Sequence, residues 1–187
     1  AEEVGLRGSR AIADQYRNLD KDVVAVLQLD MTNYTTSGTT LDLRIISDYS
    51  NAPLQQFVRT LFDTYLAPLG HTRGSSACGY ACSDHASWTQ AGYPAVFVAE
   101  PVLFPTRHTP LDKMPNVGAT AQVSVPITQL ALAFMAELGK SGIRIHTPLV
   151  CRPSVDPESD HFAGAITAAA PPRVPRRARS PQAGPLR

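Results

Sequence analysis

The chain is poor in charge and lacks any long apolar run. Charged residues make up 18% of its 187 positions, and no apolar stretch approaches the roughly 20 residues that a membrane-spanning helix needs. We expect no secretory signal within the first residues of the sequence, because residues 2 and 3 are glutamates where a signal has basic residues followed by an apolar segment. With 43% hydrophobic residues, the chain suits one soluble globular domain with a real core, and we expect no membrane partner.

Cysteine is scarce and its number is odd. Three cysteines, Cys78, Cys82 and Cys151, exclude complete pairing within the chain and also exclude a zinc site made of four cysteines. The Cys-Gly-Tyr-Ala-Cys spacing permits a local disulfide, which is more plausible in a secreted protein than in a cytosolic one.

Excess positive charge is confined to the end of the chain. Residues 141–187 carry seven arginines and three acids, a net charge of +4, whereas residues 1–140 have a net charge of −3. The same 141–187 segment holds eight of the sixteen prolines and has no hydrophobic periodicity. We therefore predict a flexible tail there, and no nucleic-acid partner, because the basic run has neither interleaved aromatics nor a folded platform.

Patterns typical of strands and helices alternate through the first 140 residues. Segment 23–31 is rich in Val and Leu, like a buried central strand. The alternation predicts an α/β fold, a three-layer sandwich with a mostly parallel central sheet, whose functional site lies at the carboxyl ends of the strands. The predicted helices are 9–18, 53–67, 84–91 and 127–138, and the predicted strands are 23–31, 40–47 and 95–99.

Polar residues with possible chemistry follow these elements. Glu2 and Glu3 are adjacent, so one could bind a metal while the other handles protons, although such pairs are commonly solvated surface residues. Asp30 ends an apolar run, where it is expensive to bury unless paired or metal-bound, or where it caps the next loop. His108 follows the predicted strand 95–99 on a loop, a position that is often only a surface position.

The segment Ser83-Asp84-His85 resembles a hydrolase triad only in composition. Triad members must converge in space, and direct neighbours seldom can. His85 alone is more typical of a core or capping histidine.

Taken together, the segments EEVGLRGS, LQLDMTNY, CGYACSDHASW, AGYPAVFVAE and RHTPLD resemble the M28 family of zinc aminopeptidases, and above all its secreted bacterial leucyl-type members. The resemblance covers residues 1–139 and does not extend into the tail. It implies a secreted, extracellular metallo-exopeptidase that removes N-terminal, mainly apolar, residues from peptide substrates.

The resemblance also implies roles for individual residues around two zinc ions. Glu2 matches the general base, Glu3 and His108 match ligands of one zinc, and Asp30 matches a ligand of the other. These ligand types suit the chemistry independently, because carboxylate and imidazole hold zinc in open sites where the metal lowers the pKa of bound water to about 7.

The remaining implied roles concern the pocket. Cys78 and Cys82 match a family disulfide, and Tyr80 between them matches a residue that contacts the substrate. Ser83 matches a group that supports the Asp30-type ligand, and Met31 is placed to line the pocket for the first residue.

The family pattern also needs a histidine and a bridging aspartate upstream of Glu2. We therefore expect residues 1–140 to be the C-terminal part of a catalytic domain, with a missing N-terminal half as its partner and weak or no activity alone. Two alternatives remain at this point. One is an enzyme like the zinc-dependent glutaminyl cyclases, and the other is a non-catalytic module that binds acidic partners through its basic tail.

Overall fold

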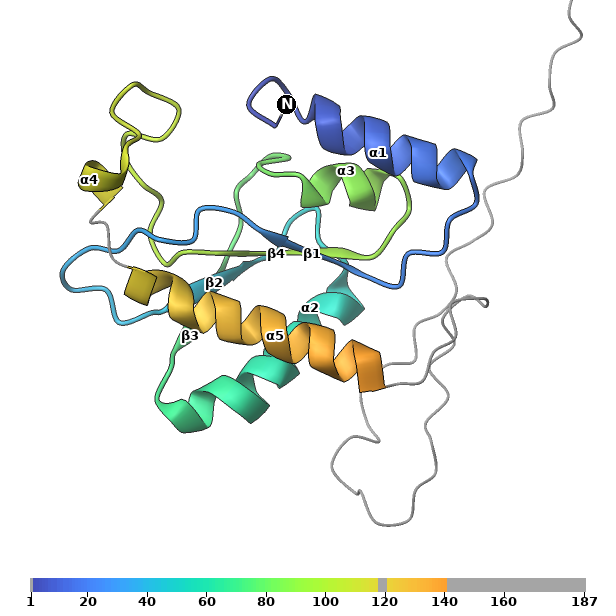
Figure 1. The fold of residues 1–187 in the computed structure, drawn as a ribbon. Coiled ribbons are helices and arrows are strands. Elements are labelled where there is room, and N and C mark those ends of the chain that lie inside the picture. The colour runs from blue at the N-terminus through green and yellow to red at the C-terminus, as the bar shows by residue number, and fades with distance from the viewer. Residues whose placement is uncertain (1, 118–120, 141–187) are drawn as a thin grey trace, which may run out of the picture.

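The computed structural model describes residues 2–117 and 121–140. One mixed sheet lies between two layers of helices, so the predicted three-layer α/β fold is confirmed (Figure 1). The predicted tail, 141–187, lies outside the described residues.

The described part of the chain forms a sheet of four strands in the order β1-β4-β2-β3. β1 pairs with β4, and β2 with β3, in parallel, whereas β2 and β4 are antiparallel. β3 was not predicted, because its sequence, RGSS, has no apolar alternation. The strands are β1 Val26–Leu29, β2 Leu43–Ile46, β3 Arg73–Ser76 and β4 Ala95–Ala99.

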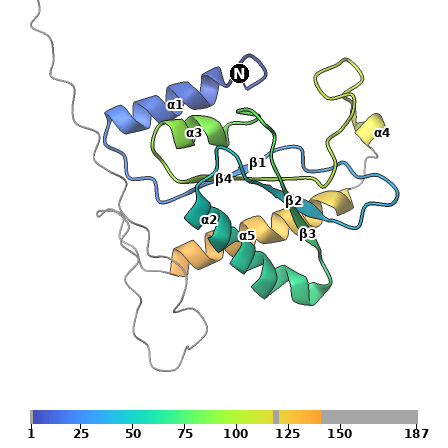
Figure 2. The same ribbon diagram turned by 180° about the vertical axis from the view of Figure 1, so that it is seen from behind.

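The helices cover the two faces of the sheet separately. α1 and α3 lie on one face, and α2 and α5 on the other, as the two opposite views show (Figures 1 and 2). The predicted helix 53–67 begins as α2, where the Asn51 side chain accepts a hydrogen bond from Leu54 N at 3.0 Å, and continues as a π-helix. The helices are α1 Arg7–Asn18, α2 Ala52–Leu61, the π-helix Phe62–Leu66, the 3₁₀ turn Ala67–Leu69, α3 His85–Gln90, α4 Met114–Val117, the 3₁₀ turn Ala121–Ser124 and α5 Val125–Lys140.

The larger core cluster lies between the sheet and the layer of α2 and α5. Val96 and Val98 of β4 contribute to it with Phe134 of α5, and all three side chains are buried. A smaller cluster on the opposite face contains Phe97 and Ile46, so successive residues of β4 supply both cores.

The interpretation of residues 23–31 as a central strand is wrong for the described sheet. β1 is half-buried at the sheet edge, and Leu29 is 40% exposed. β4 takes the central place because it pairs on both sides, and all five of its residues are buried.

One segment is more apolar than the sequence analysis allowed. Residues Ala121–Lys140 have the length and mean hydropathy, 20 residues and 1.3, of a helix that could cross a membrane. In the structure, however, Ile127, Leu130 and Phe134 of α5 pack into the larger core cluster. One face of α5 therefore packs on the core of the domain, and 22% of its apolar window is buried.

Candidate metal centre and substrate pocket

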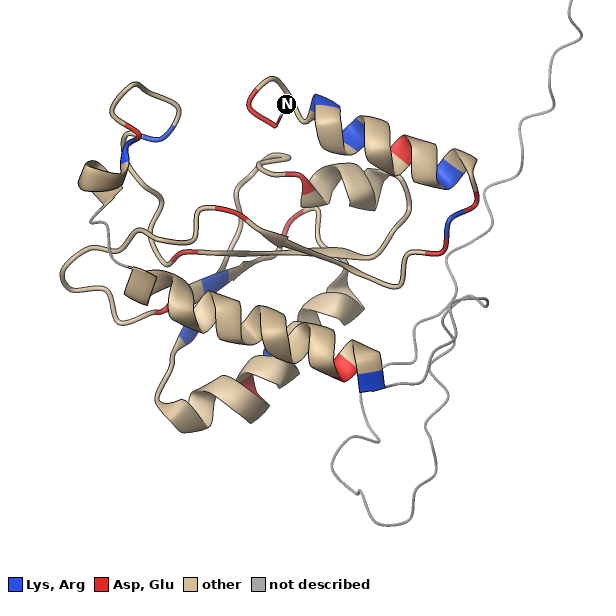
Figure 3. Ribbon diagram, viewed as in Figure 1, with Lys and Arg blue, Asp and Glu red and all other residues tan. Residues whose placement is uncertain are grey.

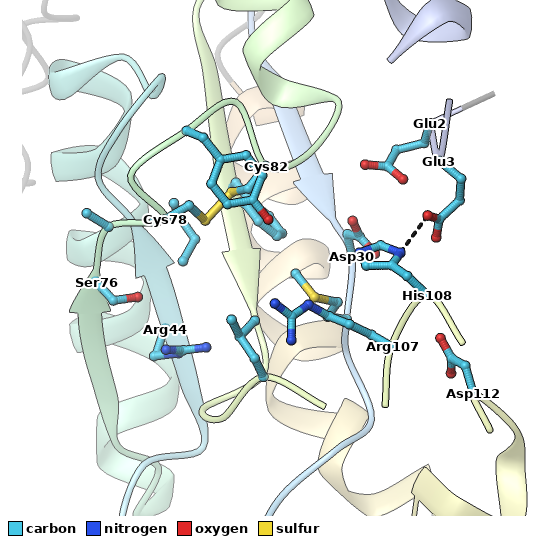
Figure 4. Close-up of a pocket in the computed structure, with 16 residues that line it drawn as sticks. Glu2, Glu3, Asp30, Arg44, Ser76, Cys78, Cys82, Arg107, His108 and Asp112 are labelled. Atoms are coloured by element: carbon cyan, nitrogen blue, oxygen red, sulfur yellow. Dashed lines mark ion pairs between the residues drawn. A yellow bond between two sulfur atoms is a disulfide. The ribbon is translucent and has the colours of Figure 1, made fainter. Parts of the chain in front are cut away.

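Three separate segments bring the predicted site residues to one cavity. Asp30 directly follows β1, His108 lies on the long loop after β4, and Glu2 and Glu3 lie on the loop before α1 (Figure 4). The ends of the parallel strands β1 and β4 meet at one edge of the sheet, where the sequence analysis expected the site. The cavity has a volume of about 250 Å³, and Met31, Tyr80 and the two pocket cysteines also line it.

Glu3 and His108 are in direct contact. Oε2 of Glu3 lies 2.5 Å from Nδ1 of His108, and the contact joins residues that are 105 positions apart in sequence (Figure 4). His108 adopts a left-handed backbone with φ of 63°, which costs roughly 1–2 kcal/mol for a residue with a Cβ. Residues with strained backbone conformations cluster at active sites and at ligand-binding positions.

Asp30 is held by a short chain of hydrogen bonds. Ser83 Oγ donates to Oδ2 of Asp30 at 2.7 Å and accepts from Nε2 of Gln28 at 3.2 Å. Ser83 is fully buried, so its hydroxyl cannot exchange these partners freely for water. The arrangement fixes the orientation of one carboxylate oxygen of Asp30.

Glu2 lies in an acidic environment. Burial raises the pKa of its carboxyl, and the neighbouring carboxylates of Asp30, Glu3 and Asp84 raise it further, against the lowering effect of His108. Acidic positions on the loop before α1, after β1 and at the start of α3 lie on the same side of the molecule (Figure 3). A carboxyl with a raised pKa is better matched to accepting a proton near neutral pH.

The Cys78–Cys82 disulfide is present, and it shapes one wall of the pocket. Asp48 holds the backbone of this loop, because its carboxylate accepts hydrogen bonds from Cys78 N at 3.0 Å and from Gly79 N at 2.7 Å. Burial alone would raise the pKa of Asp48, but these two backbone donors, together with its own N–H and the charge of His85, lower the pKa. Tyr80, at the tip of the loop, is 56% exposed beside the cavity.

Glu100 is a structural residue that the sequence analysis missed. It directly follows β4 and is 2% exposed, and its Oε2 accepts from the backbone N–H groups of Asn33 at 3.0 Å and Tyr34 at 2.6 Å. Its own N–H donates to the carbonyl of Met31, which has a left-handed backbone with φ of 52°. Glu100 thus holds the loop that follows Asp30. The sequence did contain a signal for Glu100, because this acidic residue ends the apolar run AVFVAE just as Asp30 ends the run LQLD.

Among the described residues, the two other histidines do not line this cavity. His85 is buried, its ring lies 5.0 Å from that of Phe97, and burial lowers its pKa, which is the behaviour of a core histidine. His71 pairs with Asp42 at 3.5 Å, and His146 and His161 lie outside the described residues.

The side chains at the cavity are of the types that bind metal ions, but the described residues do not form a complete metal site. Carboxylates and an imidazole are ordinary zinc ligands. Within residues 2–117 and 121–140, however, no three His, Cys, Asp or Glu side chains converge closely enough to hold an ion. The described residues therefore supply a fraction of a metal site.

Comparison with known proteins shows the family to which the chain belongs. The model of peptidase family M28 matches residues 1–133, which is most of the chain. The chain belongs to peptidase family M28.

Relatives include fungal and bacterial proteins. A probable leucine aminopeptidase of Arthroderma otae is 46% identical over 140 residues, covering 73% of this chain. The crystal structure of the Legionella pneumophila LapA aminopeptidase is 34% identical, covers 74% of this chain and superposes with a TM-score of 0.66. A zinc aminopeptidase from Bacillus subtilis shares the fold with a TM-score of 0.58 at 20% identity, over 74% of this chain.

The chain spans only part of each relative. It covers 36% of the Arthroderma protein, 37% of the LapA chain and 34% of the Bacillus chain. The activity of the whole protein is therefore a proposal.

Proposed function

We propose that the protein is a zinc-dependent aminopeptidase that removes single residues from the free N-termini of peptides. Membership of peptidase family M28 and relatives named leucine aminopeptidases support a peptide hydrolase. The observation that carries the proposal is the meeting of Glu3 with His108 beside the Asp30–Ser83 pair. Glu3, Asp30 and His108 come from three distant segments and line one cavity.

Carboxylate and imidazole groups are ordinary zinc ligands, and a solved structure with the same fold is that of a zinc aminopeptidase. Glu3 and His108 would hold one ion, and Asp30 would hold a second, with Ser83 keeping its carboxylate in place. Bound zinc would polarise the peptide carbonyl and activate a water molecule. Because the described residues supply only these ligands, we expect zinc binding and activity of this chain alone to be weak.

Glu2 is the residue we assign to proton transfer. It lines the cavity beside Glu3 without forming an ion pair with another residue of the described part of the chain. Its carboxylate would accept a proton from the attacking water and pass it to the leaving amine. Its raised pKa, caused first by burial and then by Asp30, suits that task.

The acidic cluster also accounts for action at free N-termini. Carboxylates of Glu2, Glu3 and Asp30 give one end of the cavity negative charge, which attracts an ammonium group. Met31 and Tyr80 line the same cavity, and we assign them to contact with the first side chain of the substrate.

We infer that the protein acts outside the cell. The Cys78–Cys82 disulfide supports this, because structural disulfides persist in oxidising compartments and are rare in the cytosol. The two alternatives gain no support: the relatives are named aminopeptidases and not cyclases, and the basic tail lies outside the described residues.

The test is hydrolysis of leucyl-p-nitroanilide by the zinc-supplemented protein, beside its Glu2→Gln variant and the distant control Glu137→Gln. We expect slow release of p-nitroaniline that falls by about 10²–10⁴-fold in Glu2→Gln and is retained in the control. The N-acetylated substrate should resist, because it has no ammonium group. Equal rates for Glu2→Gln and the wild type would refute the assignment of Glu2, and hydrolysis of the acetylated substrate would refute exopeptidase action.

A further inference from the structure

Two arginines occupy the end of the cavity opposite the acidic cluster. Arg44 lies on β2, and Arg107 directly precedes His108 on the loop after β4. Both line the cavity, and their guanidinium groups point toward one another, whereas the carboxylates of Glu2 and Glu3 lie at the other end (Figure 4). The cavity therefore has a negative end and a positive end.

The guanidinium of Arg44 is not fully satisfied. Its Nε donates to the carbonyl of Glu100 at 3.0 Å, but Nη2 is buried with no hydrogen-bond partner in the described part of the chain. Burial lowers the pKa of Arg44, and the nearby Glu100 acts in the opposite direction. A buried charged donor without a partner costs free energy, so a carboxylate that entered the cavity and bonded to Nη2 would stabilise Arg44.

The carboxyl of Glu100 interacts with the charge of Arg44 but forms no hydrogen bond with its Nη2. Its Oε2 accepts from the N–H groups of Asn33 and Tyr34, and Oε1 is buried without a hydrogen bond. Burial raises the pKa of Glu100, which weakens it as a counter-charge for Arg44. No ion pair joins the two side chains in the structure as described.

Arg107 is similarly available. Its Nη1 donates to the carbonyl of Phe104 at 3.2 Å, and no carboxylate of the described residues forms an ion pair with it. Asp112 also lines the cavity, but the guanidinium of Arg107 is directed away from it and toward Arg44 (Figure 4). The remaining donors of Arg107 are left for a ligand.

Part of the cavity wall is apolar. Ile46 and Phe97 of the smaller core cluster line it, and Met31 packs against the same cluster. Methylene groups of a side chain suit such a wall, and a planar guanidinium fork binds a carboxylate with two parallel hydrogen bonds. A volume of about 250 Å³ limits the occupant to roughly one amino-acid residue.

We propose that this pocket selects an acidic first residue, glutamate or aspartate, whose side-chain carboxylate is bound by Arg44 and Arg107. The ammonium group of that residue lies at the opposite end, beside Glu2, Glu3 and Asp30. The proposal rests on the proposed function for the direction in which a peptide enters. It makes the two arginines determinants of specificity.

Binding of two isosteric ligands to the purified metal-free protein tests the proposal. Glutamyl-alanine amide and glutaminyl-alanine amide differ only in the side-chain charge, and the amide cap leaves the glutamyl side chain as the only carboxylate. The ¹⁵N-edited NMR signals of the arginine Nε–H groups give both the affinity and the residues that respond. We expect the glutamyl ligand to bind about tenfold more tightly, with shifts at Arg44 and Arg107.

Three variants complete the test. Arg44→Met and Arg107→Met should each reduce the glutamyl preference to about twofold or less, and Arg10→Met, which removes one exposed charge on α1, should leave it unchanged. Should Arg44→Met fail to fold, Arg107→Met decides alone, because its side chain comes from a loop.

Equal affinity for the glutamyl and glutaminyl ligands would overturn the proposal, as would a preference that survives both substitutions or tighter binding of leucyl-alanine amide. None of these outcomes bears on the proposed function, which is decided separately by hydrolysis of leucyl-p-nitroanilide and its dependence on Glu2.

Discussion

Ser83 Oγ donates a 2.7 Å hydrogen bond to Oδ2 of Asp30, linking the segment just before α3 to the residue that follows β1 across 53 positions of sequence. Ser83 is fully buried and also accepts from Gln28. The bond therefore connects the pocket loop that follows the disulfide to the proposed metal ligand.

Replacing Ser83 with Ala should weaken both the fold and the metal site. Asp30 and Gln28 each lose a partner, which should lower the free energy of unfolding by about 1–3 kcal/mol. Zinc affinity should fall by about 10–100-fold, as for other groups that orient a metal ligand. Urea unfolding and zinc titration measure the two effects. The control Ser47→Ala removes an exposed hydroxyl bonded to the Ser76 carbonyl, and an equal loss there would contradict the special role of Ser83.

The disulfide should contribute modestly to stability. It closes a loop of few residues, for which the chain-entropy model gives about 2 kcal/mol. Converting Cys78 and Cys82 to Ser should lower the free energy of unfolding by that amount. Adding a reductant should have the same effect on the wild type and none on the double variant. Cys151→Ser is the matched control, and a similar loss there would show that the effect comes from thiol removal in general.

His85 should make stability depend on pH. Burial lowers its pKa below the ordinary 6.5 in the folded state, so the unfolded chain binds the proton more readily. The contribution of neutral His85 to the free energy of unfolding is complete above pH 6.5, and it is lost as the pH falls through the folded-state pKa of His85. Urea midpoints at pH 7 and pH 5 should differ more for the wild type than for His85→Asn. An identical pH response in the variant would show that His85 does not carry the effect.

Phe134 and Met135 are neighbours on α5 with opposite environments, since Phe134 is 5% exposed and Met135 is 61% exposed. Phe134→Ala should cost about 3–5 kcal/mol through the cavity it leaves in the larger core cluster. Met135→Ala should change the free energy of unfolding by less than about 0.5 kcal/mol. Thermal and urea unfolding measure both, and similar costs would contradict the packing of α5 as a core helix.

The sequence predicted the elements with strong periodicity. β4 was placed at 95–99 with its observed ends, and α5 was found from its apolar spacing. β3 was missed because RGSS is stabilised by pairing with β2 and not by its own pattern. The position of β1 at the sheet edge also could not be predicted, since burial depends on which strands are neighbours.

For the site, the residue types were predicted largely through family resemblance. Their convergence is a property of the fold, because Glu3 and His108 meet only when the loop after β4 returns to the start of the chain. Arg44 was overlooked because alternation placed it as an ordinary strand residue, and its role appears only beside Arg107 in the cavity. Whether a charged side chain in a pocket has a partner depends on the three-dimensional structure, so the sequence pattern alone could not show it.

The most direct test of the central claim is the zinc content of the purified protein by elemental analysis after dialysis against a zinc buffer, measured beside Glu3→Gln, His108→Ala and the control His71→Ala. The account predicts at most one weakly held zinc per chain, lost in Glu3→Gln and His108→Ala and retained in His71→Ala. Zinc content that is unchanged by His108→Ala, or two tightly held ions per chain, would contradict it.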